Sequence, residues 1–283
     1  MTPPHIKAIA IDIDGNLVVP EQDVTPRVKR AVQAARDRGV VVLLATGRRF
    51  DTAQPFAEAL DLDGPMVCSG GSMVCNARSG EIYYEDVLPP ASVVASVELL
   101  LDFGLQPLLR ERWSKGHRVF LGPAEYDDEH VGVYLQRELS AHVRLPVEEL
   151  KCVPDVMFAA ALSMDEALLQ RIAERVWTVP DLLPLVLPYG PGVLPSAAID
   201  IFNAGTNKGK ALHFVGERWG FDLADAMAIG DGINDVDLLT AVGWPVAVGN
   251  AIPAAKAVAK AVVGGNDEDG VAEAIERFVL GVA

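Results

Sequence analysis

The chain has 283 residues, of which 50% are hydrophobic and 22% are charged, a balance that predicts a packed core and excludes global disorder. Its formal net charge of −15 disfavours nonspecific binding of nucleic acid, which requires basic patches. Three cysteines without metal-type spacing, and an N-terminus without a signal-peptide pattern, favour a reduced, cytoplasmic setting. The uncharged stretch 182–199 contains four prolines, so we expect no membrane-spanning helix there.

The first and last thirds of the chain alternate short apolar stretches with helical signals. Thr25 and Pro26 supply the N-cap and first position of one helix, and Gly39 follows its end. The predicted strands are residues 6–13, 40–45, 66–68, 226–229 and 246–248, and the predicted helices are 26–38, 49–60, 210–219, 235–241, 254–259 and 271–280. Strands that are apolar on both faces and alternate with helices predict a doubly wound, Rossmann-like α/β domain with a parallel sheet.

The middle of the chain differs, because its predicted strands come in pairs, which is typical of an antiparallel α+β arrangement. The expected strands are residues 106–112, 117–121, 155–162, 183–187 and 197–202, and the expected helices are 90–103, 125–139 and 164–176. The sequence therefore predicts a core formed by residues 1–85 and 204–283, with an α+β domain inserted at residues 86–203.

Acidic side chains follow two of the predicted core strands. Asp12 and Asp14 come directly after the first strand, and Asp231 and Asp235 follow a strand near the other end of the chain. Two carboxylates one residue apart repel each other, unless a metal cation lies between them or one is protonated. Ligands of open α/β sheets bind beyond the carboxyl ends of the strands, so we expect both pairs to share one metal site.

Thr46 and Lys208 are predicted to join the acidic pairs in the same crevice. This set of groups suits phosphoryl transfer. A metal ion and Lys208 would offset phosphate charge, Thr46 and backbone N–H groups would bind its oxygens, one carboxylate would attack phosphorus, and another would handle the leaving-group proton. Taken singly, Thr46 and Asp235 could be ordinary helix caps and Lys208 a solvated lysine.

Four motifs occur in order along the chain: Asp12-Ile13-Asp14-Gly15, Leu44-Ala45-Thr46-Gly47-Arg48, Asn207-Lys208-Gly209-Lys210 and Gly230-Asp231-Gly232-Ile233-Asn234-Asp235. Together they resemble the four motifs of the haloacid dehalogenase-like (HAD) phosphatases. The resemblance is closer to the Cof-type subclass, which carries an α/β cap between its second and third motifs. It covers nearly the whole chain, including the insert, and implies a Mg²⁺-dependent phosphomonoester hydrolase.

The resemblance also implies roles for individual residues. Asp12 would be the nucleophile that forms an aspartyl-phosphate, and Asp14 would protonate the leaving alcohol and then activate the hydrolytic water. Thr46 and Lys208 would hold the phosphoryl group. Asp231, the Asp12 carboxylate and the Asp14 backbone carbonyl would bind Mg²⁺, which prefers oxygen ligands.

Further positions take supporting roles in this resemblance. Asp235 would support the metal, directly or through water, and Asn234 would touch phosphate or orient Lys208. The remaining expected substrate-binding positions are Gly15, Gly47, Arg48, Ser69 and Gly70.

The chain departs from the family pattern at two places. Asn16 stands where the family usually has threonine, and its amide can make the same local turn hydrogen bonds. Ser69-Gly70 stands where the family often has Asn-Gly near the substrate, so the resemblance does not specify the substrate. Specificity is expected to come from the cap, which would close over the substrate. The cap candidates are Arg112, Trp113, Lys115 and Tyr189.

The function predicted from the sequence is hydrolysis of a small soluble phosphate ester, such as a sugar phosphate or a polyol phosphate, by a monomer or homodimer without nucleic-acid or membrane partners. Two alternatives remain at this point. A phosphosugar mutase could use the same aspartyl-phosphate, and a noncatalytic protein could bind the phospholigand without turnover.

Overall fold

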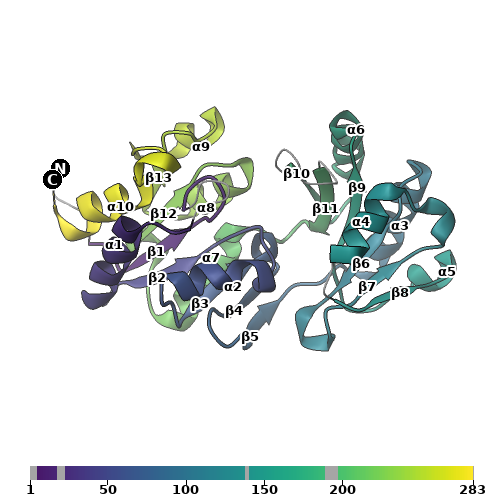
Figure 1. The fold of residues 1–283 in the computed structure, drawn as a ribbon, viewed down its shortest axis with the longest axis horizontal. Coiled ribbons are helices and arrows are strands. Elements are labelled where there is room, and N and C mark those ends of the chain that lie inside the picture. Colours follow the sequence, from purple (N-terminus) through teal and green to yellow (C-terminus); the bar gives the residue numbers. More distant parts are fainter. Residues whose placement is uncertain (1–4, 18–22, 138–139, 189–196, 283) are drawn as a thin grey trace. The chain divides into compact units, whose positions relative to one another are not determined.

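The computed structural model describes residues 5–17, 23–137, 140–188 and 197–282. The chain divides into two compact units, which we name the core unit (Met1–Tyr84 with Asn207–Ala283) and the insert unit (Glu85–Thr206) (Figure 1). Tyr189, one of the predicted specificity residues, lies outside the described residues. Within the described part of the chain, no helix is long and apolar enough to cross a membrane.

The core unit is built on a five-stranded parallel sheet with the strand order β14-β13-β12-β1-β2 (Figure 1). Its strands are β1 (Ala8–Ile11), β2 (Val41–Leu44), β12 (Ala226–Gly230), β13 (Trp244–Ala247) and β14 (Ala261–Val262). Its helices are α1 (Pro26–Asp37), α2 (Phe50–Ala59), α7 (Lys208–Trp219), α8 (Val236–Ala241), α9 (Pro253–Val258) and α10 (Gly270–Ile275), which a π-helical turn (Glu276–Leu280) extends. The predicted α/β class is confirmed.

The order of the strands determines where a ligand site can form. From β1 the chain moves through α1 to β2, whereas from β12 it moves through α8 to β13 in the opposite direction along the sheet. Right-handed crossovers in opposite directions place their helices on opposite faces of the sheet. The order therefore reverses between β1 and β12, which are paired in register from Ala8 with Ala226 to Ile11 with Ile229. Ligands of such folds bind at this switch point, beyond the carboxyl ends of the two strands.

A second, three-stranded sheet of the core unit has the order β3-β4-β5, with β3 (Pro65–Cys68), β4 (Met73–Asn76) and β5 (Ile82–Glu85). A parallel bridge between Ala45 and Val67 connects β3 to the end of β2. The sequence predicted β3, but not β4 or β5. Both missed strands have only four residues, too few for their alternation to stand out from that of a loop.

The insert unit contains a six-stranded sheet with the order β10-β11-β9-β6-β7-β8. Its strands are β6 (Leu108–Glu111), β7 (Val119–Leu121), β8 (His142–Arg144), β9 (Val156–Ser163), β10 (Leu182–Pro188) and β11 (Ala197–Asn203), and its helices are α3 (Pro90–Asp102), α4 (Glu129–Arg137), α5 (Val147–Leu150) and α6 (Glu166–Val176). The pairs are antiparallel except for β7 with β8, which are parallel. Leu100 of α3, Leu109 of β6 and Ile172 of α6 belong to its buried core.

Two details of the insert unit differ from the sequence prediction. The helix expected from residue 125 begins only at Glu129, because Asp128 accepts a hydrogen bond from the Val131 amide and caps it there (Oδ1 to N, 2.9 Å). The short elements β8 and α5 were not predicted, since three or four residues carry too little periodicity to identify them.

Candidate active site

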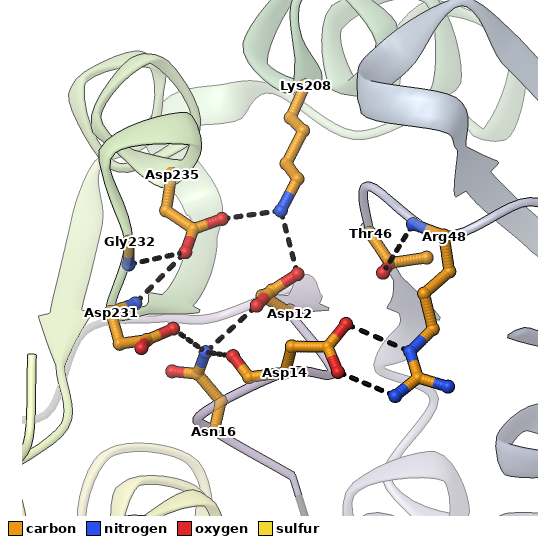
Figure 2. Close-up of polar contacts among 9 residues, drawn as sticks. All are labelled: Asp12, Asp14, Asn16, Thr46, Arg48, Lys208, Asp231, Gly232 and Asp235. Atoms are coloured by element: carbon orange, nitrogen blue, oxygen red, sulfur yellow. Dashed lines mark hydrogen bonds and ion pairs between the residues drawn. The ribbon is translucent and has the colours of Figure 1, made fainter. Parts of the chain in front are cut away.

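Asp12 and Lys208 form the buried centre of the site (Figure 2). Asp12 follows β1 directly, and its amide donates to the Ile229 carbonyl (3.0 Å), which continues the pairing with β12. Lys208 begins α7 after the N-cap Asn207, and only 1% of its surface is exposed. Its Nζ atom lies 2.7 Å from Asp12 Oδ1 and 2.6 Å from Asp235 Oδ1. The reading of Lys208 as a solvated surface lysine is therefore wrong.

Two glycines allow α7 to present Lys208 at this point. A Cβ atom on Gly71 would lie 2.3 Å from the carbonyl oxygen of Asn207, and the φ angle of Gly71 is +107°, a region that disfavours other residues. A Cβ atom on Gly209 would lie 2.7 Å from the Asp237 carbonyl oxygen, so this glycine lets α7 pack closely on α8. The start of α7 is thus fixed between the turn after β3 and the start of α8.

Asp235 organises the loop that follows β12. It is fully buried, and its Oδ2 atom accepts hydrogen bonds from the amides of Asp231 (3.0 Å) and Gly232 (2.9 Å). Its Oδ1 atom accepts from Lys208. Both oxygens of Asp235 are therefore engaged within the protein, and these contacts fix the backbone that carries Asp231.

The amide nitrogen of Asn16 lies where the first and fourth motifs converge (Figure 2). It donates to Asp12 Oδ2 (3.0 Å), the Asp14 backbone carbonyl (3.1 Å) and Asp231 Oδ1 (2.6 Å). Gly15 permits this approach, because a Cβ atom there would lie 2.2 Å from Asp231 Oδ2. The sequence predicted only local turn contacts for Asn16, whereas one of its three partners is far away in the chain.

The second motif contacts the first and the fourth. Arg48 holds the Asp14 carboxylate with two hydrogen bonds, from Nε to Oδ2 (2.9 Å) and from Nη2 to Oδ1 (2.6 Å). This carboxylate is more than half exposed, unlike that of Asp12. A Cβ atom on Gly47 would lie 3.6 Å from Asn234 Nδ2, so these two predicted substrate-binding positions are neighbours.

The turn after β3 is attached to the second motif. The Gly70 amide donates to the Thr46 carbonyl (3.1 Å), and the Ser69 amide donates to the Arg48 carbonyl (2.8 Å). Thr46 is fully buried, and its hydroxyl oxygen accepts a hydrogen bond from the Arg48 amide (3.1 Å). The hydroxyl hydrogen of Thr46 is thus left to donate elsewhere.

The sequence model of the haloacid dehalogenase-like hydrolases matches residues 9–275. The chain belongs to this family. The "Pyridoxal phosphate phosphatase YbhA" of Escherichia coli is 28% identical over 287 residues, which cover 97% of this chain and 99% of that protein. The "5-amino-6-(5-phospho-D-ribitylamino)uracil phosphatase YcsE" of Bacillus subtilis is 28% identical over 275 residues, covering 97% and 96%.

Solved structures agree with the family assignment at the level of the fold. A haloacid dehalogenase-like hydrolase from Bacillus subtilis superposes with a TM-score of 0.77 at 21% identity, covering 97% of this chain and 100% of that one. The predicted membership of the HAD superfamily, the α/β fold with its insert and the phosphatase class are therefore confirmed.

Burial sets the protonation behaviour of this HAD site. Burial, together with the charge of Asp235, raises the pKa of Asp12 to about 8, although Lys208 acts in the opposite direction. Burial and Asp235 also raise the pKa of Asp231 to about 6. Burial lowers the pKa of Lys208, but the charges of Asp12 and Asp235 outweigh this effect and raise it overall. The site thus holds more carboxylates than its buried ammonium can neutralise.

The same carboxylates have the chemistry of a metal site. Asp12, Asp231 and Asp235 can each offer one oxygen, and these atoms lie within 4.8 Å of one another. Oxygen ligands of this kind fit hard divalent cations such as Mg²⁺. A cation here would offset the excess negative charge that raises the pKa values of Asp12 and Asp231.

The structure gathers the predicted site positions of the core unit around one point. They are Asp12, Asp14, Gly15, Thr46, Gly47, Arg48, Ser69, Gly70, Lys208, Asp231, Asn234 and Asp235. In the insert unit, Arg112, Trp113 and Lys115 lie in the connection between β6 and β7, and Arg112 Nη2 is 3.1 Å from Asp155 Oδ1. The individual roles of all these residues, and the part of the insert unit in specificity, stay predictions.

Sequence reasoning missed two contacts of the site. It placed Arg48 against the substrate without its pairing to Asp14, and it placed Asn16 in a local turn without its contact to Asp231. The signal that could have indicated the first contact is the presence of an arginine directly after Thr-Gly at a strand end, level with an acidic pair on the neighbouring strand.

Proposed function

We propose that this HAD protein is a Mg²⁺-dependent phosphomonoester hydrolase of small phosphorylated metabolites, which acts through an aspartyl-phosphate on Asp12. The observation that carries the proposal is the environment of the Asp12 carboxylate. It lies beyond β1 at the switch point of the sheet, with Lys208 at one oxygen and the amide of Asn16, shared with Asp231, at the other. The Asp12 carboxylate is therefore suited to attack phosphorus, while the fixed ammonium of Lys208 neutralises phosphate charge.

The proposed reaction has two steps. In the first, an Asp12 carboxylate oxygen forms a bond to phosphorus, the bond from phosphorus to the ester oxygen breaks, and Asp14 gives its proton to the leaving alkoxide. In the second, Asp14 takes a proton from water, the water oxygen attacks phosphorus, and the bond to Asp12 breaks to release inorganic phosphate. Lys208 and the Thr46 hydroxyl would bind the phosphoryl oxygens in both steps.

In this scheme the Asp14 carboxylate is either paired with Arg48 or released from it. The bidentate pair of Arg48 with Asp14 holds this carboxylate in place, and the same contact raises the pKa of Arg48. A substrate phosphate offers Arg48 an anion of higher charge. We propose that Arg48 turns to the phosphate when substrate binds, so that Asp14 is released to exchange protons with the leaving group and water.

Mg²⁺ would supply charge neutralisation at the phosphoryl group and would favour ionisation of the nucleophile. The residues that would hold it are Asp12 and Asp231, through their carboxylates, and Asp14, through its backbone carbonyl. Asp235 would act through its hydrogen bonds to the loop that carries Asp231.

The class of substrate is proposed from the relatives. The names of the Escherichia coli and Bacillus subtilis relatives give pyridoxal phosphate and a phosphoribityl compound as their substrates. Both are phosphate esters of a small hydroxylated molecule. We therefore propose a sugar phosphate, a polyol phosphate or a similar metabolite as the substrate of this chain, and the reduced cytoplasm as its setting. The predictions of a monomer or homodimer without nucleic-acid partners remain to be tested by light scattering and by salt-dependent binding to DNA and RNA.

The test is phosphate release from sugar phosphates, polyol phosphates, nucleotides, flavin mononucleotide and pyridoxal phosphate, with Mg²⁺ and with chelator. The variants are Asp12→Asn and, as a matched control, Asp37→Asn at an exposed position of α1. Release that requires Mg²⁺ and is lost only in Asp12→Asn supports the proposal. An isomerised product with little free phosphate would instead indicate a mutase, and tight binding without turnover a noncatalytic protein.

A further inference from the structure

The side-chain nitrogen of Asn16 is surrounded by more hydrogen-bond acceptors than it has N–H groups to donate. Its nitrogen carries two N–H donors, yet three oxygen atoms lie between 2.6 and 3.1 Å from it. Only 2% of the residue is exposed, and its Oδ1 atom is buried without a hydrogen-bond donor among the described residues. The hydrogen bonds of the nitrogen therefore determine how the amide is oriented, and its own oxygen is left without a donor.

The three oxygens around this nitrogen are the same ones proposed as ligands of Mg²⁺. They are a carboxylate oxygen of Asp12, the backbone carbonyl of Asp14 and a carboxylate oxygen of Asp231. A Mg²⁺ ion held by the same three oxygens would have to lie among them, in the space that the amide nitrogen fills. The nitrogen and the cation cannot occupy this position together.

We propose that Asn16 is a positioning residue that substitutes for the cation, so that its amide holds the three oxygens together without Mg²⁺ and must leave when Mg²⁺ binds. The inference rests on the proposed Mg²⁺ site, and it concerns what this chain does there in place of the family's threonine. The N–H groups of Asn16 bring a partial positive charge between two carboxylates that would otherwise repel each other. Asn16 thus stabilises the metal-free protein and competes with the metal.

The competition between Asn16 and Mg²⁺ predicts how a substitution of Asn16 changes metal-free stability and Mg²⁺ affinity. Threonine has one O–H donor on a shorter side chain, so in Asn16→Thr it can serve at most one of the three oxygens. The metal-free protein then loses stability, while the metal-bound protein, from which the amide has withdrawn, does not. We expect Asn16→Thr to bind Mg²⁺ about tenfold more tightly than the wild type, since at least one charge-assisted hydrogen bond no longer has to be broken.

The experiment measures the dissociation constant of Mg²⁺ by calorimetry and the thermal unfolding of each protein in chelator and in saturating Mg²⁺. Asn250→Thr is the matched control, because its exposed amide donates to the Gly15 carbonyl (2.8 Å) in the same loop but to none of the three oxygens. Asn16→Thr should unfold earlier than the wild type in chelator and at the same temperature in Mg²⁺. Asn250→Thr should leave the Mg²⁺ dissociation constant unchanged.

A second variant makes the same test with a larger expected effect, and unfolding in saturating Mg²⁺ shows whether each variant folds. Asn16→Asp keeps the shape of the side chain, removes both N–H donors and adds a charge, so it should lower metal-free stability further and bind Mg²⁺ more tightly still. Equal or weaker Mg²⁺ binding by Asn16→Thr would overturn the inference, and so would an equal effect of Asn250→Thr or a wild type that binds no Mg²⁺. If the Mg²⁺ dissociation constants shift as expected but the wild type releases no phosphate, only the proposed function is contradicted. If the wild type releases phosphate but the dissociation constants do not shift, only the role of Asn16 is contradicted.

Discussion

Replacing Lys208 by methionine tests the balance of charge in the core of the site. Methionine keeps the apolar stem but removes the ammonium, which leaves the carboxylates of Asp12 and Asp235 buried without the cation that lies 2.7 and 2.6 Å from them. Removing one partner of a buried ion pair costs about 3–5 kcal/mol. Because a unit of 150–250 residues loses about 2–4 °C in melting temperature per kcal/mol, we expect a fall of about 6–20 °C.

The assay is thermal unfolding followed by circular dichroism in chelator at pH 8 and at pH 5. The deficit should be smaller at pH 5 than at pH 8, because Asp12, whose pKa burial raises to about 8, is still partly ionised at pH 8 but fully protonated at pH 5. Lys210→Met is the control, since Lys210 lies on the same helix and is exposed. A Lys208→Met protein as stable as Lys210→Met at pH 8 would refute the argument that the ammonium stabilises this cluster.

Three further predictions concern metal and substrate. Gly15→Ala should weaken Mg²⁺ binding more than tenfold by calorimetry, since the new Cβ would lie 2.2 Å from Asp231 Oδ2 at a φ of +74°, and an unchanged dissociation constant would contradict this. Mg²⁺ binding should release protons near pH 7 and tighten from pH 6 to pH 8. The reason is that the pKa values of Asp12 and Asp231 are raised to about 8 and about 6, and both carboxyl groups must ionise to bind metal. A pH-independent affinity for Mg²⁺ would contradict this prediction. Arg48→Gln should lower kcat/KM about 10- to 100-fold in steady-state kinetics through the loss of a charge-assisted contact to phosphate, and an unaltered kcat/KM would remove Arg48 from the substrate site.

The core fold could be predicted because its central strands are buried on both faces. Ala10 and Ile11 are fully buried although they point to opposite faces of β1, and apolar runs of this kind occur again at β2 and β12. The strands that escaped prediction, β4, β5, β8 and β14, have two to four residues each. Their identity depends on partners brought together by the fold rather than on a pattern within the segment.

The site was predictable to the extent that it depends on strand ends. Asp12 and Asp231 follow two strands that pair in register, so topology alone brings their backbones together. Burial was not predictable in the same way. Lys208 and Lys210 stand in one motif, yet one is buried and the other exposed, and only the packing of α7 decides between them. The contact of Asn16 with Asp231 joins residues 215 positions apart and depends on how closely two loops approach.

The central claim is that Asp12 accepts the phosphoryl group, and it can be measured directly. Asp14→Asn is mixed with p-nitrophenyl phosphate and Mg²⁺, because this leaving group departs without a proton whereas hydrolysis of the intermediate still needs Asp14. The protein is quenched in acid within the first turnover and its phosphorylated peptide is sequenced by mass spectrometry. We predict phosphate on Asp12, and no phosphorylated peptide when Asp12→Asn is added to the variant. Phosphate on another residue, or full turnover by Asp12→Asn alone, would contradict the account.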